Sequence, residues 1–304
     1  MELVVVGYGN MAKAILGGLI RQSKELLDIT KIVIAGRAPR KIEAWLQESM
    51  QTCRSEFLND VIYETTYDIE CDGRVVLLAC KPYNLDSFIF HGRAHIVYSV
   101  LAGINAGVLH NHIQSYHYAL IMPNVGARYN LSSSAVLWQQ HATKNQTIKE
   151  VGKVLNLMID SHNMQEAHEK NNAHIQTQII RFVSSFGNCE FVESEEELFA
   201  SIATNGSSPA LLALVAQGLI NAGVKQGLKL ETSQRLVQKT FEGMAALLKE
   251  KSPQEIKDLV TSPGGTTAEA LLFCDENSVQ GNIARACVKA VEKAKEIASK
   301  QANI

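Results

Sequence analysis

The chain has 304 residues, of which 46% are hydrophobic and 20% charged. This composition is typical of a globular protein with room for about two domains, and it excludes disordered and collagen-like chains. The 29 Lys and Arg residues nearly balance the 31 Asp and Glu residues. The chain therefore has no large positive net charge that would attract nucleic acid or an anionic membrane, and we expect neither as a partner.

Cysteine and histidine patterns argue against export and against a metal. The six cysteines contain no Cys-x-x-Cys pair, which is unlike a zinc site or a disulfide framework and predicts a cytoplasmic location. No uninterrupted apolar run reaches the ~18 residues of a membrane span, and no signal peptide is recognisable. His110 and His112 are expected on opposite faces of a strand, and like His91 and His95 they have no further ligand at suitable spacing, so no metal is predicted.

The first half alternates short apolar runs with amphipathic segments, a pattern typical of βαβ units. A helix is expected over 11–21, where apolar residues recur at helical spacing. The expected strands are 3–6, 31–35, 74–79, 94–100 and 116–121. We therefore predict an α/β fold in which residues 1–140 form a Rossmann-type, doubly wound parallel sheet that binds a dinucleotide.

A polar stretch at 141–174 predicts a linker or insertion, and residues 175–304 are expected to be all helical, with no strand. Glu193 and Glu195 to Glu197 are expected to begin a helix, where negative charge is favourable. Long helices are predicted over 209–228, 233–248 and 282–299. The helix from Pro209 is apolar on nearly every face, and so small a domain cannot bury it alone, which predicts a homodimer.

A dinucleotide signal follows the first predicted strand directly. Gly7-Tyr8-Gly9-Asn10-Met11-Ala12 is a G-x-G-x-x-A turn that opens a helix. Gly7 permits the tight turn, Gly9 lets the backbone approach a pyrophosphate, and Ala12 allows close helix packing. The free N–H groups at Asn10 and Met11 suit the anion.

The end of the second strand predicts NADP(H), with NAD(H) as the alternative. An acidic residue at that place binds the ribose of NAD, whereas arginine accommodates the 2′-phosphate of NADP. This chain has Arg37, followed by Arg40 and Lys41, and no acid. A solvated basic turn would have the same sequence, so both interpretations stay open.

Two further loops are expected at carboxyl strand ends, where cofactors bind. Lys81 and Pro82 follow the strand that ends at residue 79, and Ala102 follows the next one. We interpret all three as cofactor-binding positions, although Lys81 could equally be an exposed lysine.

The run Thr261-Ser262-Pro263-Gly264-Gly265-Thr266-Thr267 precedes a predicted helix. Its hydroxyls can cap the helix or bind a ligand, its glycines let the backbone approach a ligand, and the free N–H groups of the helix suit a small carboxylate. An ordinary helix cap after a proline turn explains the same pattern equally well.

Taken together, these motifs resemble those of the pyrroline-5-carboxylate reductase family. The resemblance rests on segments 7–19, 81–82, 122–124, 206–210, 222–228 and 261–271, and covers most of the chain outside 139–174. It implies NADPH-dependent reduction of the cyclic imine 1-pyrroline-5-carboxylate to L-proline, the last step of proline biosynthesis. It also implies a Rossmann domain, then a helical domain that dimerises, with dimers often assembling into a decamer.

The resemblance also implies roles for individual residues. Ser262, Gly265, Thr266 and Thr267 would bind the substrate carboxylate and ring, with the catalytic Thr267 hydroxyl near the ring nitrogen. Asn124 would belong to the cofactor site. Hydride transfer to an imine is chemistry of the cofactor, so the protein supplies orientation and electrostatics and needs no metal.

Four places depart from the family's usual residues. Leu120 stands where an arginine is usual, Asn205 stands for a serine, and Ser208 stands for a glycine. Ala35-Gly36 stands where a small polar pair usually precedes the arginine. Two other functions stay open beside the imine reductase. One is a related reductase of hydroxy acids with Lys225 as proton donor, and the other is a non-catalytic dinucleotide-binding protein.

Overall fold

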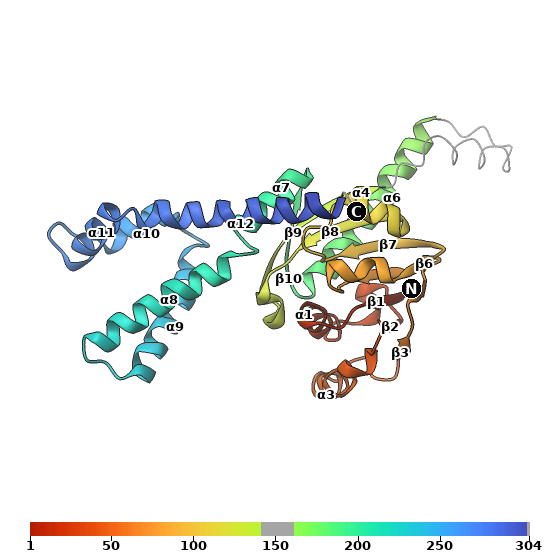
Figure 1. The fold of residues 1–304 in the computed structure, drawn as a ribbon, viewed down its shortest axis with the longest axis horizontal. Helices are drawn as coiled ribbons and strands as arrows, with labels where there is room; N and C mark the ends of the chain where they lie inside the picture. The colour runs from red at the N-terminus through yellow and green to blue at the C-terminus, as the bar shows by residue number, and fades with distance from the viewer. Residues whose placement is uncertain (141–160, 303–304) are drawn as a thin grey trace. The chain divides into compact units, whose positions relative to one another are not determined.

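The computed structural model describes residues 1–140 and 161–302. Contacts divide the chain into two compact units, coloured by residue number in Figure 1. One unit comprises Met1–Gly206 with Lys293–Ile304, and the other comprises Ser207–Glu292. Each is described by itself below.

The first unit is built on an eight-stranded sheet in the order β10-β9-β8-β7-β5-β1-β2-β3. Its pairs are parallel except for β8 with β9, which is antiparallel. The strands are β1 (Glu2–Val6), β2 (Lys31–Gly36), β3 (Val61–Thr65), β5 (Val75–Leu78), β7 (Arg93–Ser99), β8 (Gln114–Met122), β9 (Ser132–Gln140) and β10 (Gly187–Val192). A separate pair joins β4 (Asp68–Glu70) to β6 (Ile89–His91). Because the chain moves outward in both directions from β1, the sheet is doubly wound, as predicted.

Both faces of the sheet are covered, because alternate strand residues point to opposite sides. On β1, Leu3 and Val5 join one core cluster, and Val4 and Val6 join the other. Helices α1 (Asn10–Leu19), α3 (Glu43–Cys53) and α6 (Ser161–Ser184) cover the first face, while η2 (Pro82–Ser87), α4 (Ala106–His112) and α7 (Glu195–Ala200) cover the second. Short α2 (Lys24–Leu27), η1 (Pro39–Ile42), η3 (Val125–Tyr129) and η4 (Ser201–Ala203) complete the unit.

The second unit is helical throughout, which confirms the predicted fold class. It contains α8 (Ser208–Lys225), α9 (Leu230–Leu247), α10 (Pro253–Val260), α11 (Thr266–Glu276) and the first part of α12 (Val279–Ala302). A hydrogen bond from Ser233 Oγ to the Ile220 carbonyl, 3.0 Å long, joins α9 to α8. Within the described chain α8 has no buried residue, so its apolar faces are uncovered in a single copy.

The apolar strands and long helices form as predicted, but two expectations are wrong. A strand does follow residue 175, since β10 pairs with β9 at the sheet edge. None of its residues is fully buried, so no apolar run marks it. His110 and His112 lie on helix α4, not on a strand, because Asn105 caps a helix there through the Val108 amide. Of the expected linker, 141–160 lies outside the described residues, and α6 begins at Ser161.

Candidate functional site

A cleft of about 980 Å³ lies at the carboxyl ends of β1, β2, β5 and β7 in the first unit. This is the switch point of a doubly wound sheet, where such folds bind their ligands. Its lining comes from the turns that follow these strands. The lining residues are Gly7, Tyr8, Gly9, Asn10, Met11, Gly36, Arg37, Tyr67, Ala79, Cys80, Lys81, Pro82, Tyr83, Asn84, Ser87, Phe88, Val100 and Ala102.

The turn between β1 and α1 has the shape of a phosphate cradle. Gly7 has φ +104°, and a Cβ there would stand 2.5 Å from the Cys80 nitrogen, so the turn crosses close over the end of β5. A Cβ on Gly9 would have nothing within 4 Å, which leaves the backbone approachable. Helix α1 has no side-chain cap and no acid in its first turn. Its N–H groups therefore suit a pyrophosphate, so this turn fits a dinucleotide.

The charge of the cleft also fits a phosphorylated ligand. Its lining includes two cations, Arg37 and Lys81, and no Asp or Glu. Arg40 is engaged elsewhere, because its guanidinium contacts the Glu43 carboxylate at 2.9 Å. Arg37 is therefore the arginine that the second strand presents to the cleft, as the pattern of cations indicated.

Two of the predicted cofactor residues lie away from this cleft lining. Ala12 is fully buried, which fits its expected role in helix packing. Asn124 caps η3, since its Oδ1 accepts the Gly126 N–H at 2.9 Å and its own N–H donates to Ser132 Oγ at 3.0 Å. Its cofactor role stays a prediction, whereas Gly7, Gly9, Asn10, Met11, Arg37, Lys81, Pro82 and Ala102 all meet in the cleft.

Aromatic side chains form one wall of the cleft, and the sequence analysis did not identify them. Tyr67 precedes β4, and Tyr83 and Phe88 lie in and after η2. The rings of Tyr67 and Phe88 approach to 5.5 Å between centroids. A base or ribose can lie against such surfaces. Only the excess of aromatic residues after Lys81-Pro82 hinted at this wall.

Cys80 lies in the same cleft. Burial raises the pKa of its thiol to about 11, so the thiol is protonated at neutral pH. A protonated thiol is a poor nucleophile. We therefore assign Cys80 no covalent role.

In the second unit, the run 261–267 forms a compact turn before α11. Gly264 has φ +68°, and the Gly265 N–H donates to the Ser262 carbonyl at 2.9 Å. Gly265 is the N-cap of α11, and no side chain caps this helix. The structure therefore brings Ser262, Gly265, Thr266 and Thr267 into one turn whose helix N–H groups can bind a carboxylate.

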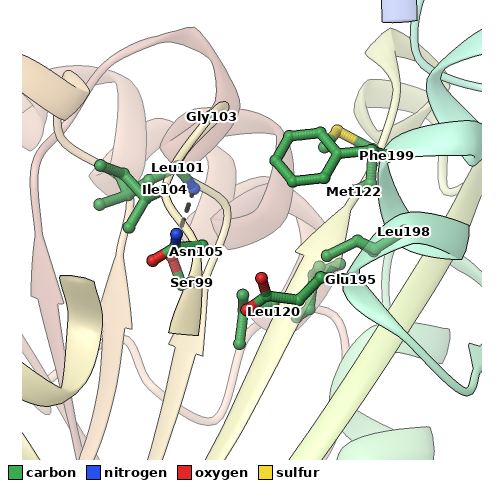
Figure 2. Close-up of a pocket in the computed structure, with 11 residues that line it drawn as sticks. Ser99, Leu101, Gly103, Ile104, Asn105, Leu120, Met122, Glu195, Leu198 and Phe199 are labelled. Atoms are coloured by element: carbon green, nitrogen blue, oxygen red, sulfur yellow. Dashed lines mark hydrogen bonds between the residues drawn. The ribbon is translucent and has the colours of Figure 1, made fainter. Parts of the chain in front are cut away.

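Leu120, the first departure from the family pattern, lines a small pocket between the ends of β7 and β8 and helix α7, shown in Figure 2. The pocket holds about 10 Å³, room for one water at most. Leu120 is 3% exposed and packs in an apolar cluster, while Glu195 is occupied by the Ala106 N–H at 2.8 Å. Leu120 is therefore a packing residue of the core.

Asn205, the second departure, joins two strands just before α8. Its Nδ2 donates to the Met122 carbonyl at 2.7 Å and to the Ser133 carbonyl at 2.9 Å. The residue is 5% exposed. Asn205 thus ties the ends of β8 and β9 to the chain that leads into the helical unit.

We expect Asn205→Ala to lower the free energy of unfolding by about 2 kcal/mol, because two buried hydrogen bonds are lost at about 1 kcal/mol each. Urea unfolding followed by circular dichroism measures this change. Gln114→Ala is the control, since it removes an exposed hydrogen bond to the His110 carbonyl and should change stability by about 0.5 kcal/mol or less. Equal effects of the two substitutions would contradict a structural role for Asn205.

Two family models match the chain. Residues 2–103 match the model described as NADP oxidoreductase, coenzyme F420-dependent, and residues 195–297 match pyrroline-5-carboxylate reductase dimerisation. These matches cover the β1 to β7 region with its cleft, and the helices from α7 into α12.

Relatives match over nearly the whole chain. A pyrroline-5-carboxylate reductase of Helicobacter pylori strain J99 is 37% identical, over 96% of this chain and 99% of the relative. The fold is similar to the crystal structure of 1-pyrroline-5-carboxylate reductase from Streptococcus pyogenes, with TM-score 0.68, 23% identity and coverage of 97% and 98% of the two chains. It is also similar to the Plasmodium falciparum pyrroline carboxylate reductase with NADP bound, with TM-score 0.63, 20% identity and coverage of 98% of each chain. The chain therefore belongs to the pyrroline-5-carboxylate reductase family.

Proposed function

We propose that this chain catalyses the NADPH-dependent reduction of 1-pyrroline-5-carboxylate to L-proline. The observation that carries this proposal is the cleft, with a phosphate cradle at Gly7 and Gly9, two cations and no acid in its lining. Purified protein is expected to oxidise NADPH when 1-pyrroline-5-carboxylate is added, and not when keto acids are added. Oxidation of NADPH with a keto acid alone, or reduction of NADP+ by a hydroxy acid, would support the related reductase, and binding without turnover would support a dinucleotide sensor.

The first unit holds the cofactor in this proposal. The N–H groups of Asn10 and Met11 at the start of α1 bind the pyrophosphate, and Arg37 binds the 2′-phosphate. Lys81, Pro82 and Ala102 border the cofactor from the next two strand ends, with Asn124 beyond them. When bound, NADPH supplies the hydride.

The run before α11 holds the substrate. Ser262 and Thr266 bind the carboxylate through hydroxyl and N–H groups, where the helix terminus favours negative charge, and Gly265 lets the backbone approach it. The Thr267 hydroxyl donates a hydrogen bond to the lone pair that the ring nitrogen gains as hydride is transferred. A protonated imine is already electrophilic and becomes the neutral amine by hydride transfer alone, so no strong general acid is needed.

Arg37→Ala is expected to raise KM for NADPH about tenfold or more, since a charge-assisted hydrogen bond contributes about 1.5–3 kcal/mol. KM for NADH should stay unchanged, because NADH has no 2′-phosphate. Initial rates at varied cofactor concentration measure both constants. Arg40→Ala is the control, because Arg40 is engaged by Glu43. Equal changes for the two cofactors after Arg37→Ala would reject the 2′-phosphate contact.

We further propose that the helical unit forms a homodimer, which can assemble further into a homodecamer, in the cytoplasm. Apolar residues of α8 are exposed in the single chain, including Leu212 at 52% and Leu214 at 69%. The stretch Glu195–Lys225 is long and apolar enough to cross a membrane. Core helices of globular proteins meet the same two criteria of length and hydropathy, so this is weak evidence for a membrane span. The match of 195–297 to a dimerisation model supports burial against a second copy.

These assignments give the two parts of the chain different roles. We propose that cofactor binding belongs to residues 1–140, and substrate binding and dimerisation to residues 175–304.

A further inference from the structure

Tyr8, the residue between the two glycines of the cradle, contacts the turn after β2 at two points. Its phenol oxygen accepts a hydrogen bond from the Ala38 N–H at 3.1 Å. Its ring covers Gly36, where a Cβ would meet Tyr8 Cε1 at 3.2 Å. These two contacts fall on the residues immediately before and after Arg37.

Few other restraints act on Arg37. Its side chain is exposed and forms no ion pair within residues 1–140 and 161–302. Gly36 has φ +143°, a conformation that residues with a side chain rarely adopt, so the strand ends there in an unusual bend. Pro39 begins η1 directly afterwards. The position of the Arg37 backbone therefore depends on Gly36 and Ala38, and Tyr8 contacts both.

We propose that Tyr8 is a positioning residue that sets the preference for NADPH over NADH by fixing the turn that carries Arg37. The inference rests on the proposed function, in which Arg37 binds the 2′-phosphate. A charge-assisted hydrogen bond needs its donor held in a defined place, and a donor held in advance loses less entropy on binding. NADH lacks the phosphate, so its affinity does not depend on where Arg37 lies.

The decisive variant is Tyr8→Phe, which removes the acceptor of the Ala38 N–H and keeps the ring over Gly36. The Kd for NADPH should rise about three- to tenfold, the effect of one hydrogen bond of about 0.5–1.5 kcal/mol. The Kd for NADH should stay unchanged. Titration followed by nicotinamide fluorescence measures both constants without substrate. Tyr116→Phe is the matched control, because Tyr116 is an exposed residue of β8 outside the cleft lining.

A double-mutant cycle separates positioning from direct contact. If Tyr8 acts through Arg37, Tyr8→Phe has no further effect on NADPH binding in an Arg37→Ala background. Equal losses for NADPH and NADH, or a loss that persists in that background, would overturn the inference. If Arg37→Ala itself leaves NADPH binding unchanged, the 2′-phosphate assignment fails and the inference with it. If Arg37→Ala weakens NADPH and Tyr8→Phe does not, only the inference fails.

Discussion

Thr267→Val is expected to lower kcat for imine reduction about tenfold or more, the scale of losing a positioned proton or hydrogen-bond donor. The substitution keeps the size and branching of the side chain and removes the hydroxyl alone. Thr267 lies in the first turn of α11, directly after Thr266, and is half-buried. Because the lost bond strengthens as the ring nitrogen gains electrons, kcat should fall more than the affinity for the substrate.

Steady-state rates with 1-pyrroline-5-carboxylate at saturating NADPH measure this effect. Thr267→Ser should restore most of the rate, because it returns the hydroxyl. Thr177→Val is the matched control, since Thr177 is exposed on α6 and its hydroxyl donates to the Ala173 carbonyl of its own helix. Full turnover of Thr267→Val would remove the catalytic assignment.

Rates of the same kind, measured with whichever of the imine and the keto acids supports oxidation of NADPH, discriminate the hydroxy-acid reductase. Lys225, its proposed proton donor, is the last residue of α8. In that case Lys225→Ala would abolish activity and Thr267→Val would be tolerated. The imine reductase predicts the opposite order of the two effects.

Short stretches of sequence were enough to predict those parts of the fold that depend on neighbouring residues alone. Leu3 to Val6 and Lys31 to Ala35 form buried parallel strands, whose apolar runs are visible in a single sequence. The cradle was predictable because its glycines directly follow the first strand, and their backbone conformations are set by the short turn that they form themselves.

The parts that escaped prediction depend on segments far apart in the chain. Tyr67 directly precedes β4 and Phe88 directly precedes β6, and they share one wall because these two strands pair in the separate two-stranded sheet. No pattern within a short stretch of sequence predicts this contact between the two rings. Asn205 is similar, since its role appears only when β8 and β9 pair beside it. The edge strand β10 was missed because pairing on one side needs no buried apolar run.

Gly7→Ala is expected to lower the free energy of unfolding of the first unit by about 3 kcal/mol or more. At φ +104° a side chain is strained, which costs about 1–3 kcal/mol. The new Cβ would also lie 2.5 Å from the Cys80 nitrogen and 2.7 Å from the Ala79 carbonyl carbon. These are backbone atoms of the β5 end, so no change of rotamer relieves the overlap. Thermal unfolding without cofactor measures the loss.

Gly9→Ala should separate binding from stability. Gly9 has φ −76°, which any residue adopts, and its Cβ would meet nothing within 4 Å. The unfolding temperature should therefore stay unchanged, while the Kd for NADPH rises about tenfold or more because the methyl group obstructs the close approach of the pyrophosphate. Unchanged affinity would show that this backbone does not contact the cofactor. A fall in unfolding temperature equal to that of Gly7→Ala would instead mean that both glycines serve the fold, and the cradle would lose its functional meaning.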